Sequence, residues 1–164
     1  MPISFLRLVM HPFKYRIFLL TKLPAAFFSG VRVQYADEAK ALVTVPYKWL
    51  TTNPFKSTYF ACLSMAAEMS TGLLAMAHTY KQQPPISMLV VKTEGNYFKK
   101  ATGITTFTCE DGIAIQHIIQ EAMSSGKSTS ITARSIGKDN SGEVVAEFSI
   151  TWSFKIKANK NNSN

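Results

Sequence analysis

The amino-acid sequence predicts an α+β fold in which one long, nearly uncharged helix is wrapped by a curved antiparallel sheet. Three observations carry this prediction. Residues 57–80 contain a single formal charge, Glu68, within a helical stretch of apolar and small side chains. Residues 144–156 alternate apolar and polar side chains, and residues 31–45 have the pattern of a β-hairpin. A helix that is apolar on nearly every face must be surrounded by protein or lipid. Because its polar residues make it a poor membrane span, we expect the sheet to surround it.

The first half of the chain predicts helices, a hairpin and then the central helix. Residues 1–30 predict two short amphipathic helices separated by Pro12 and closed by Pro24 and Gly30, which we expect to form an N-terminal helical flap. The hairpin turns at Asp37-Glu38, where the alternation of apolar residues is interrupted. The central helix then begins near Ser57 or Thr58, since either hydroxyl can cap its first turn.

The second half predicts strands that complete one sheet. After Pro84-Pro85, the apolar residues 86–91 predict a strand buried on both faces, and residues 95–100 predict a polar turn. A strand is expected at residues 102–109, followed by a surface helix at residues 110–126 that Gly126 ends. The last two strands, at residues 129–135 and 144–156, are expected to form a hairpin. We expect a single domain over residues 1–164, with a disordered tail at residues 158–164.

The composition points to a self-associating protein. Of the 164 residues, 46% are hydrophobic and only 17% are charged, which is few for a surface exposed to water on all sides. Together with the apolar strand at residues 86–91, this predicts a homodimer and leaves open whether two dimers pair into a homotetramer. The net charge of +8 is scattered and no recognition motif accompanies it, so no nucleic-acid partner is expected.

The cysteines and the N-terminus favour the cytoplasm. Cys62 and Cys109 lie in predicted core segments without metal-binding or disulfide spacing, as free thiols do in a reducing compartment. Basic residues and Pro12 interrupt the apolar N-terminal segment, which therefore differs from an export signal. The polar residues of the central helix argue against stable membrane insertion. None of the histidines has a ligand partner at suitable spacing, so no metal site is expected.

The order of elements resembles the hotdog fold of the acyl-CoA thioesterases, over roughly residues 31–157. In the phenylacetate-type branch of these enzymes an Asn precedes a His-Gly-Gly turn, and an acidic residue follows about two helical turns later. The matching positions here are Asn53, then Tyr59-Phe60-Ala61, then Glu68, so the three turn residues differ from the family pattern. The resemblance implies a divergent, thioesterase-like branch of the superfamily.

Glu68 is the candidate catalytic residue, because a carboxylate among apolar side chains is costly and tends toward a raised pKa. Such a group can act as the general base that activates water. The alternative is a structural Glu68 that binds a basic side chain or backbone amides of a neighbouring strand. Asn53 is the second catalytic candidate, as a residue that orients water or carbonyl; alternatively it only shapes the loop before Pro54.

Residues near Glu68 are candidates for binding the substrate. The helix start could stabilise an oxyanion through free amides of Tyr59 and Phe60. Helical spacing places further side chains on the face of Glu68 or along an acyl tunnel, although each could equally be ordinary packing. The substrate-binding set is Tyr59, Phe60, Ala61, Ser64, Met65, Met69, Thr71 and Gly72. Lys99 and Lys100 are candidates for the phosphates of coenzyme A, or else solvated surface lysines.

Three functions remain open from the sequence. The first is an acyl-CoA thioesterase-like hydrolase at a dimer interface, whose small-molecule substrate contains coenzyme A and which needs no other cofactor. The second is a noncatalytic protein that binds acyl-CoA or a fatty acyl chain, suggested by the replaced His-Gly-Gly turn. The third is a purely structural dimer with a dry core.

Overall fold

The computed structural model describes residues 2–157, and the expected disordered tail lies outside them. The described helices are α1 (Pro2–Met10), α2 (Pro12–Lys22), α3 (Pro24–Ser29), the short 3-10 helix η1 (Trp49–Thr51), α4 (Phe60–Thr79) and α5 (Gly112–Ser125). The strands are β1 (Arg32–Ala36), β2 (Ala41–Val45), β3 (Ile86–Tyr97), β4 (Thr105–Cys109), β5 (Thr129–Lys138) and β6 (Val144–Ile156).

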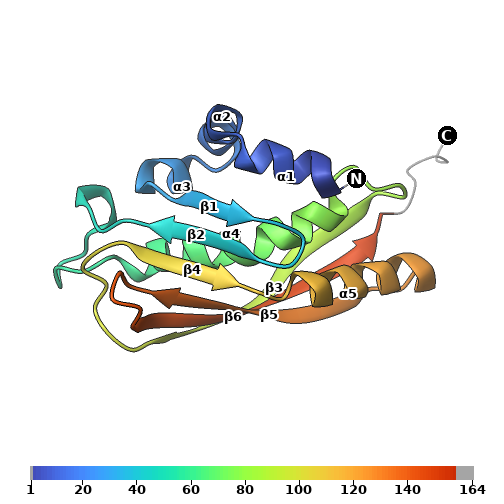
Figure 1. Ribbon diagram of the computed structural model, residues 1–164. Coiled ribbons are helices and arrows are strands. Elements are labelled where there is room, and N and C mark those ends of the chain that lie inside the picture. The colour runs from blue at the N-terminus through green and yellow to red at the C-terminus, as the bar shows by residue number, and fades with distance from the viewer. Residues whose placement is uncertain (1, 158–164) are drawn as a thin grey trace, which may run out of the picture.

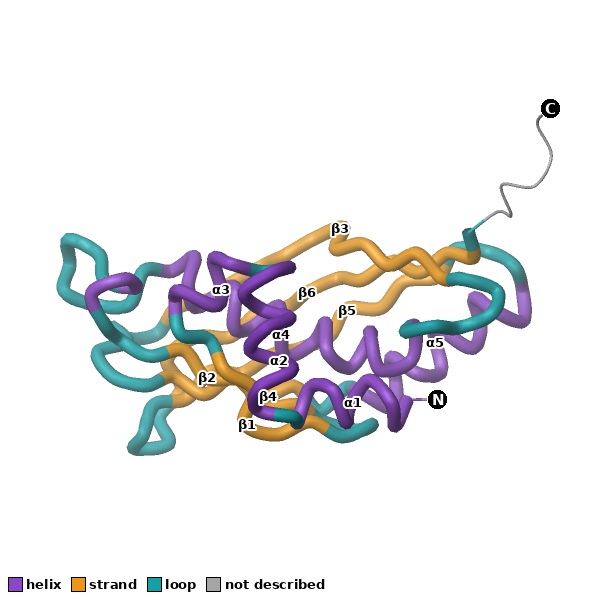
Figure 2. Tube along the Cα trace, turned by 90° about the horizontal axis from the view of Figure 1, so that it is seen from above, coloured by secondary structure: helices purple, strands orange, loops and turns teal. Residues whose placement is uncertain are grey.

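The strands form one antiparallel, curved sheet that wraps α4, as the sequence predicts. Their order is β1-β2-β4-β5-β6-β3, so β1 and β3 are the two edges (Figure 1). Figure 2 shows α4 running along one face of the sheet, while α1, α2 and α3 cover it near β1. The α+β class and the central helix are therefore confirmed.

The central helix is the core of the molecule, and its side chains are mostly buried between the sheet and the N-terminal helices. By length and composition α4 could span a membrane, but 67% of its apolar 18-residue stretch is buried inside the protein. It begins later than expected. Thr58 donates its amide and its hydroxyl to the carbonyl of Ala101, at 2.8 and 3.2 Å, so it ties down the loop and does not cap the helix. Tyr59 takes the capping position.

The N-terminal flap contains three helices where the sequence predicts two. Pro24 was expected to close the second helix, yet it stands in the first turn of α3, where its missing amide hydrogen costs nothing. Gly30 ends α3 with a φ of 78°, a left-handed conformation that glycine adopts readily. Within the flap, α1 packs on α4 and β1, and α3 packs on α4.

The third strand is twice as long as predicted. Residues 95–97, expected in a turn, continue β3 and pair with Phe148, Glu147 and Ala146 of β6. Gly95 fits there because the ring of Phe148 comes within 2.8 Å of the position that a Cβ would occupy. Burial on both faces is also wrong within one protomer. Leu89 and Val91 are 63% and 55% exposed, because they alternate with the core-facing Met88 and Val90 and point to the other face of the sheet.

The remaining elements agree with the sequence predictions in type and order. The hairpins β1–β2 and β5–β6 form as expected, and Gly126 ends α5 in the left-handed conformation. The amide of Gly112, at the start of α5, donates to the carbonyl of Ala39 at 2.9 Å. This contact holds the β1–β2 turn against α5.

Candidate functional site

Glu68 lies midway along α4, partly buried beside β6. Its Oε1 is 3.4 Å from the position that a Cβ on Gly72 would take, and the indole ring of Trp152 is 3.2 Å from the same position. Trp152 Nε1 donates to Thr71 Oγ1 at 2.9 Å, and Thr71 in turn donates to the carbonyl of Glu68 at 3.0 Å. The strand thus fixes the helix turn that carries the carboxylate. Trp152 was not among the predicted site residues.

Burial raises the pKa of Glu68 above its ordinary value. Among the described residues, its carboxylate has no hydrogen bond and no ion pair that would compensate for this burial. Both oxygens of this carboxylate nevertheless contact solvent. Neither is among the side-chain oxygens and nitrogens that are fully buried without a hydrogen-bond partner. The structural role considered for Glu68 requires such a partner, so the geometry favours a chemical role.

Tyr15 is a second residue that the sequence did not indicate. It is buried on the inner side of α2, and its pKa is raised first by burial and then by the negative charge of Glu68. The flap therefore brings a phenol into the electrostatic range of the carboxylate. Because Tyr15 and Glu68 are far apart in the sequence, only the packing of α2 on the core reveals this relation.

The start of α4 presents unpaired backbone amides. Tyr59 was predicted to offer a free amide, but this group donates to the carbonyl of Thr51 at 2.7 Å. The amides of Phe60 and Ala61 have no acceptor among the described residues, as is usual in the first turn of a helix. They can bind an anion or an oxyanion together with the positive end of the helix dipole. The exposed rings of Tyr59 and Phe60 flank this position, with their centroids 4.8 Å apart.

Asn53 shapes the loop that leads into α4. Its Oδ1 accepts hydrogen bonds from the amides of Phe55 and Ser57 at 2.9 and 3.2 Å, and from the Ser57 hydroxyl at 3.3 Å. These contacts show that the side-chain oxygen of Asn53 shapes the loop, which is the alternative role considered for this residue. A part for Asn53 in orienting water remains a prediction.

The other predicted binding residues divide between the face of Glu68 and the core. Ser64 and Met65 are partly exposed one turn before Glu68, whereas Met69 is buried in the core. Of the two lysines predicted to bind phosphate, Lys99 forms ion pairs with Asp139, at 2.7 Å, and with Glu143.

Lys100 points its Nζ at the carbonyl of Phe55, 3.3 Å away, and has no carboxylate partner among the described residues. Of the two lysines, Lys100 is therefore the one whose charge is available to a phosphate.

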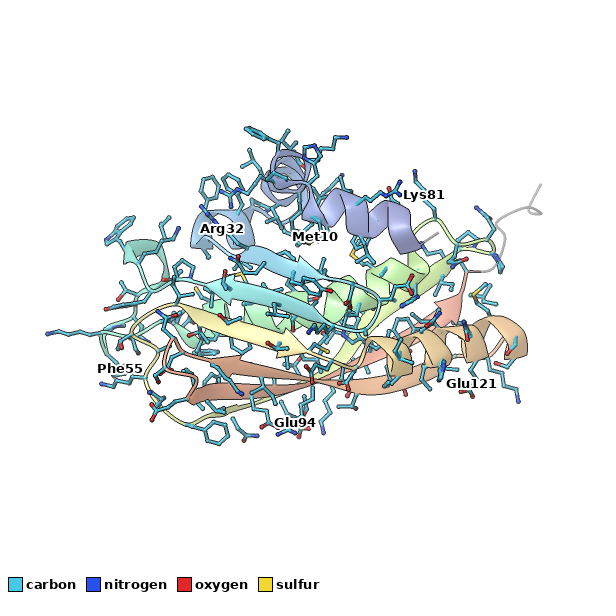
Figure 3. The ribbon with its side chains drawn as sticks, in the orientation of Figure 1. Met10, Arg32, Phe55, Lys81, Glu94 and Glu121 are labelled. Carbon is cyan, nitrogen blue, oxygen red and sulfur yellow. The ribbon has the colours of Figure 1, made fainter. Side chains whose placement is uncertain are left out.

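A groove of about 710 Å³ lies between the N-terminal helices and β1, and Glu68 is not among the residues that line it. Figure 3 labels two of its lining residues, Met10 and Arg32. The guanidinium of Arg16, which also lines the groove, stacks over the ring of Phe27 at 4.1 Å. Its Nη1 is buried and has no hydrogen-bond acceptor among the described residues.

The raised pKa of Glu68 predicts that Glu68→Gln stabilises the fold at neutral pH. Folding favours the protonated acid, so ionisation destabilises the native state as the pH rises from 4.5 through the higher folded pKa. The neutral amide avoids this penalty. We expect a higher melting temperature for Glu68→Gln at neutral pH and a smaller difference at pH below 4.5, measured by scanning calorimetry.

Glu121→Gln, on the exposed face of α5, is the matched control and should not show this gain (Figure 3). A lower melting temperature for Glu68→Gln at neutral pH would instead mean that the carboxylate supports the structure.

Comparison with known proteins identifies the fold and a family. The sequence matches, over residues 16–154, a family described as a domain of unknown function (DUF4442). None of the curated proteins is significantly similar to the chain.

Three solved structures illustrate the fold. A protein of unknown function from Pseudomonas aeruginosa, described as a probable thioesterase, has a TM-score of 0.75 at 20% identity, covering 89% of this chain and 97% of its own. A thioesterase from Haemophilus influenzae has a TM-score of 0.61 at 12% identity, covering 87% and 90%. A mutant thioesterase from Pseudomonas aeruginosa has a TM-score of 0.64 at 12% identity, covering 89% and 96%. The hotdog fold is thus confirmed.

Proposed function

The chain belongs to the DUF4442 family, and on that premise we propose that it hydrolyses acyl-CoA thioesters as a homodimer, with a water molecule activated by Glu68. The observation that carries the proposal is the partly buried Glu68 carboxylate, which lacks a compensating partner among the described residues and still reaches solvent. Structural neighbours named thioesterases support the substrate class. Coenzyme A enters as part of the substrate, and the reaction needs no other cofactor.

The reaction requires one base and one oxyanion site. Glu68 removes a proton from water while the water oxygen attacks the thioester carbonyl carbon. The negative charge that develops on the carbonyl oxygen is stabilised by amides at the start of an α4 helix, those of Phe60 and Ala61. The tetrahedral intermediate then expels the thiolate of coenzyme A, which takes the proton from Glu68 and leaves the free acid.

Two protomers are needed because a single α4 helix does not bring its N-terminal amides and Glu68 together. Phe60 and Glu68 are eight residues apart on α4, which corresponds to about 12 Å along the helix axis. An antiparallel α4 from a second protomer would place its N-terminal amides opposite Glu68. The long uncovered edge of β3 supports this arrangement, since paired edges would form one continuous sheet.

Charges on the β3 edge are expected to dissociate the dimer. In Leu89→Lys/Val91→Lys, like charges on the two exposed apolar positions would face each other across the twofold axis. We expect a monomer at micromolar concentration by sedimentation velocity, with loss of hydrolysis. Ile113→Lys replaces an exposed apolar residue of α5 and should remain dimeric. A double mutant that stays dimeric would exclude β3 as the interface.

The function itself is tested with purified protein and a panel of acyl-CoA esters of different chain length. Release of free coenzyme A thiol, followed with a thiol reagent, is the expected result. If no ester in the panel is hydrolysed while acyl-CoA binds, the enzymatic proposal fails.

Binding without turnover is the second candidate, and the entrance to α4 favours it. The side-chain oxygen of Asn53 is hydrogen-bonded within its own loop. The bulky Tyr59 and Phe60 occupy the positions where related enzymes have a His and a Gly. This candidate predicts an acyl ligand that copurifies with the protein and is released only on denaturation. Mass spectrometry of the denatured sample distinguishes the two functions.

We place the protein in the cytoplasm. Cys62 and Cys109 are both buried free thiols, and burial raises the pKa of each. Such thiols are inert and suit a reducing compartment, where acyl-CoA is also found in solution.

A further inference from the structure

Helix α2 is apolar on both of its sides. Tyr15 and Leu19 face inward and are buried, as in any helix that packs on a core. On the opposite side, Phe13 is 77% exposed and Ile17 60% exposed, with Leu20 next to them. A helix whose outer side faces only water would carry polar residues there. The outer side of α2 is therefore suited to an apolar environment.

The exposed apolar residues of α2 continue onto the neighbouring helices. We call this set the N-terminal apolar face, and it consists of Met10, Phe13, Ile17, Leu20, Leu23 and Phe28. Four of these residues, Met10, Phe13, Ile17 and Leu20, line one groove, so they are not a scatter of single exposed side chains, which would need no explanation. Figures 1 and 2 place these helices on the β1 side of the molecule, away from the free edge of β3. A dimer formed through β3 therefore leaves the face uncovered.

The charge around this face has one sign. Residues 1–36 contain five basic residues and no acidic residue, so more than half of the net charge of +8 lies in this part of the sequence. Arg7, Lys14, Lys22 and Arg32 are exposed. A lipid bilayer with anionic headgroups complements a surface that combines exposed Phe, Ile and Leu side chains with lysines and arginines.

A second copy of the chain complements this face less well. Twofold pairing of the face with itself would bring lysines and arginines opposite one another, without any acidic residue from residues 1–36 to pair with them. The groove that this face helps to line has the same character, because the described residues that line it include Arg16 and Arg32 and no carboxylate. The buried Nη1 of Arg16 in particular lacks an acceptor among the described residues.

We propose that the N-terminal apolar face binds reversibly to the surface of anionic membranes. Phe13 and Ile17 enter the boundary between headgroups and acyl chains, and the surrounding basic side chains contact the lipid phosphates. No helix crosses the bilayer in this arrangement, since α4 remains in the core. The proposal does not depend on Glu68 or on hydrolysis, so it is tested without an activity measurement.

The test is cosedimentation of the full-length protein with two kinds of vesicle, one of phosphatidylcholine alone and one of phosphatidylcholine mixed with phosphatidylglycerol. We expect binding to the anionic vesicles to be at least about tenfold tighter and to weaken as salt is added. Phe13→Ser/Ile17→Ser and Lys14→Glu/Lys22→Glu should each lower that affinity by about tenfold or more. Equal binding to both kinds of vesicle, or to neither, would overturn the proposal.

The control variant is Trp49→Ser/Phe55→Ser, which removes two exposed aromatic side chains, 86% and 71% exposed, from the loop before α4. It should bind anionic vesicles like the wild-type protein. Sedimentation velocity without vesicles addresses the competing occupant. If Phe13→Ser/Ile17→Ser reduces the oligomeric state, the face joins copies of the chain and the membrane proposal is wrong; an unchanged state supports it.

Discussion

Replacing Glu68 with Gln is expected to lower kcat/KM for acyl-CoA hydrolysis by about 10²- to 10⁴-fold. The amide keeps the size of the side chain but cannot accept a proton from the attacking water. Because burial raises the pKa of Glu68, the wild-type rate should also rise with pH through a midpoint above 4.5. Thiol release measured across a range of pH values tests both statements.

Glu121→Gln is the matched control for this experiment, since it makes the same chemical change on the exposed face of α5. It should leave kcat/KM unchanged. Equal activity of Glu68→Gln and the wild-type protein would exclude Glu68 as the base. A slow mutant that still binds acyl-CoA with unchanged affinity would locate its role in the chemical step.

Replacing Gly112 with Ala is expected to lower the free energy of unfolding by about 3 kcal/mol. A Cβ at this position would lie 2.1 Å from the carbonyl oxygen of Glu38 and 2.7 Å from that of Ala39. Both atoms belong to the backbone of the β1–β2 turn, so no side-chain rotation relieves the clash. The turn must move away from α5 and lose the hydrogen bond between Gly112 and Ala39.

Urea unfolding measures this loss, and Gly103→Ala provides the control. Apart from Gly103 itself and its two chain neighbours, no described residue has an atom within 4 Å of a Cβ built on Gly103, so this mutant should differ from the wild-type protein by less than about 0.5 kcal/mol. If Gly112→Ala unfolds at the same urea concentration as the wild-type protein, the close packing of the turn on α5 does not contribute to stability.

Most of the fold could be predicted because periodicity reports local structure. Alternation over residues 144–156 predicts β6, and the uncharged stretch around Glu68 predicts a covered helix. The predictions of secondary structure are wrong where a residue type can have more than one structural role. Pro24 reads as a stop but begins α3, and Gly95 reads as a turn but makes room for the ring of Phe148 inside a strand.

The site was harder to predict than the fold because its contacts are long-range. Composition identifies Glu68, since one charge in an apolar helix is visible in the sequence itself. The contact of Trp152 with Thr71 depends on β6 packing against α4. The neutralisation of Lys99 depends on Asp139 and Glu143, which are 40 and 44 residues away in the sequence. The amide of Tyr59 donates to the carbonyl of Thr51 within the irregular loop before α4, and periodicity does not report the path of such a loop.

The position of β3 in the sheet affects how the nascent chain folds. During synthesis β3 leaves the ribosome before β4, α5 and β5, yet the only strand that pairs with it in the described sheet is β6, the last one. The hairpin β5–β6 closes over a short turn, whereas β3 must join it across a long loop, which is the slower event. Completion of the polypeptide therefore limits burial of α4, because Trp152 is delivered by that same final strand.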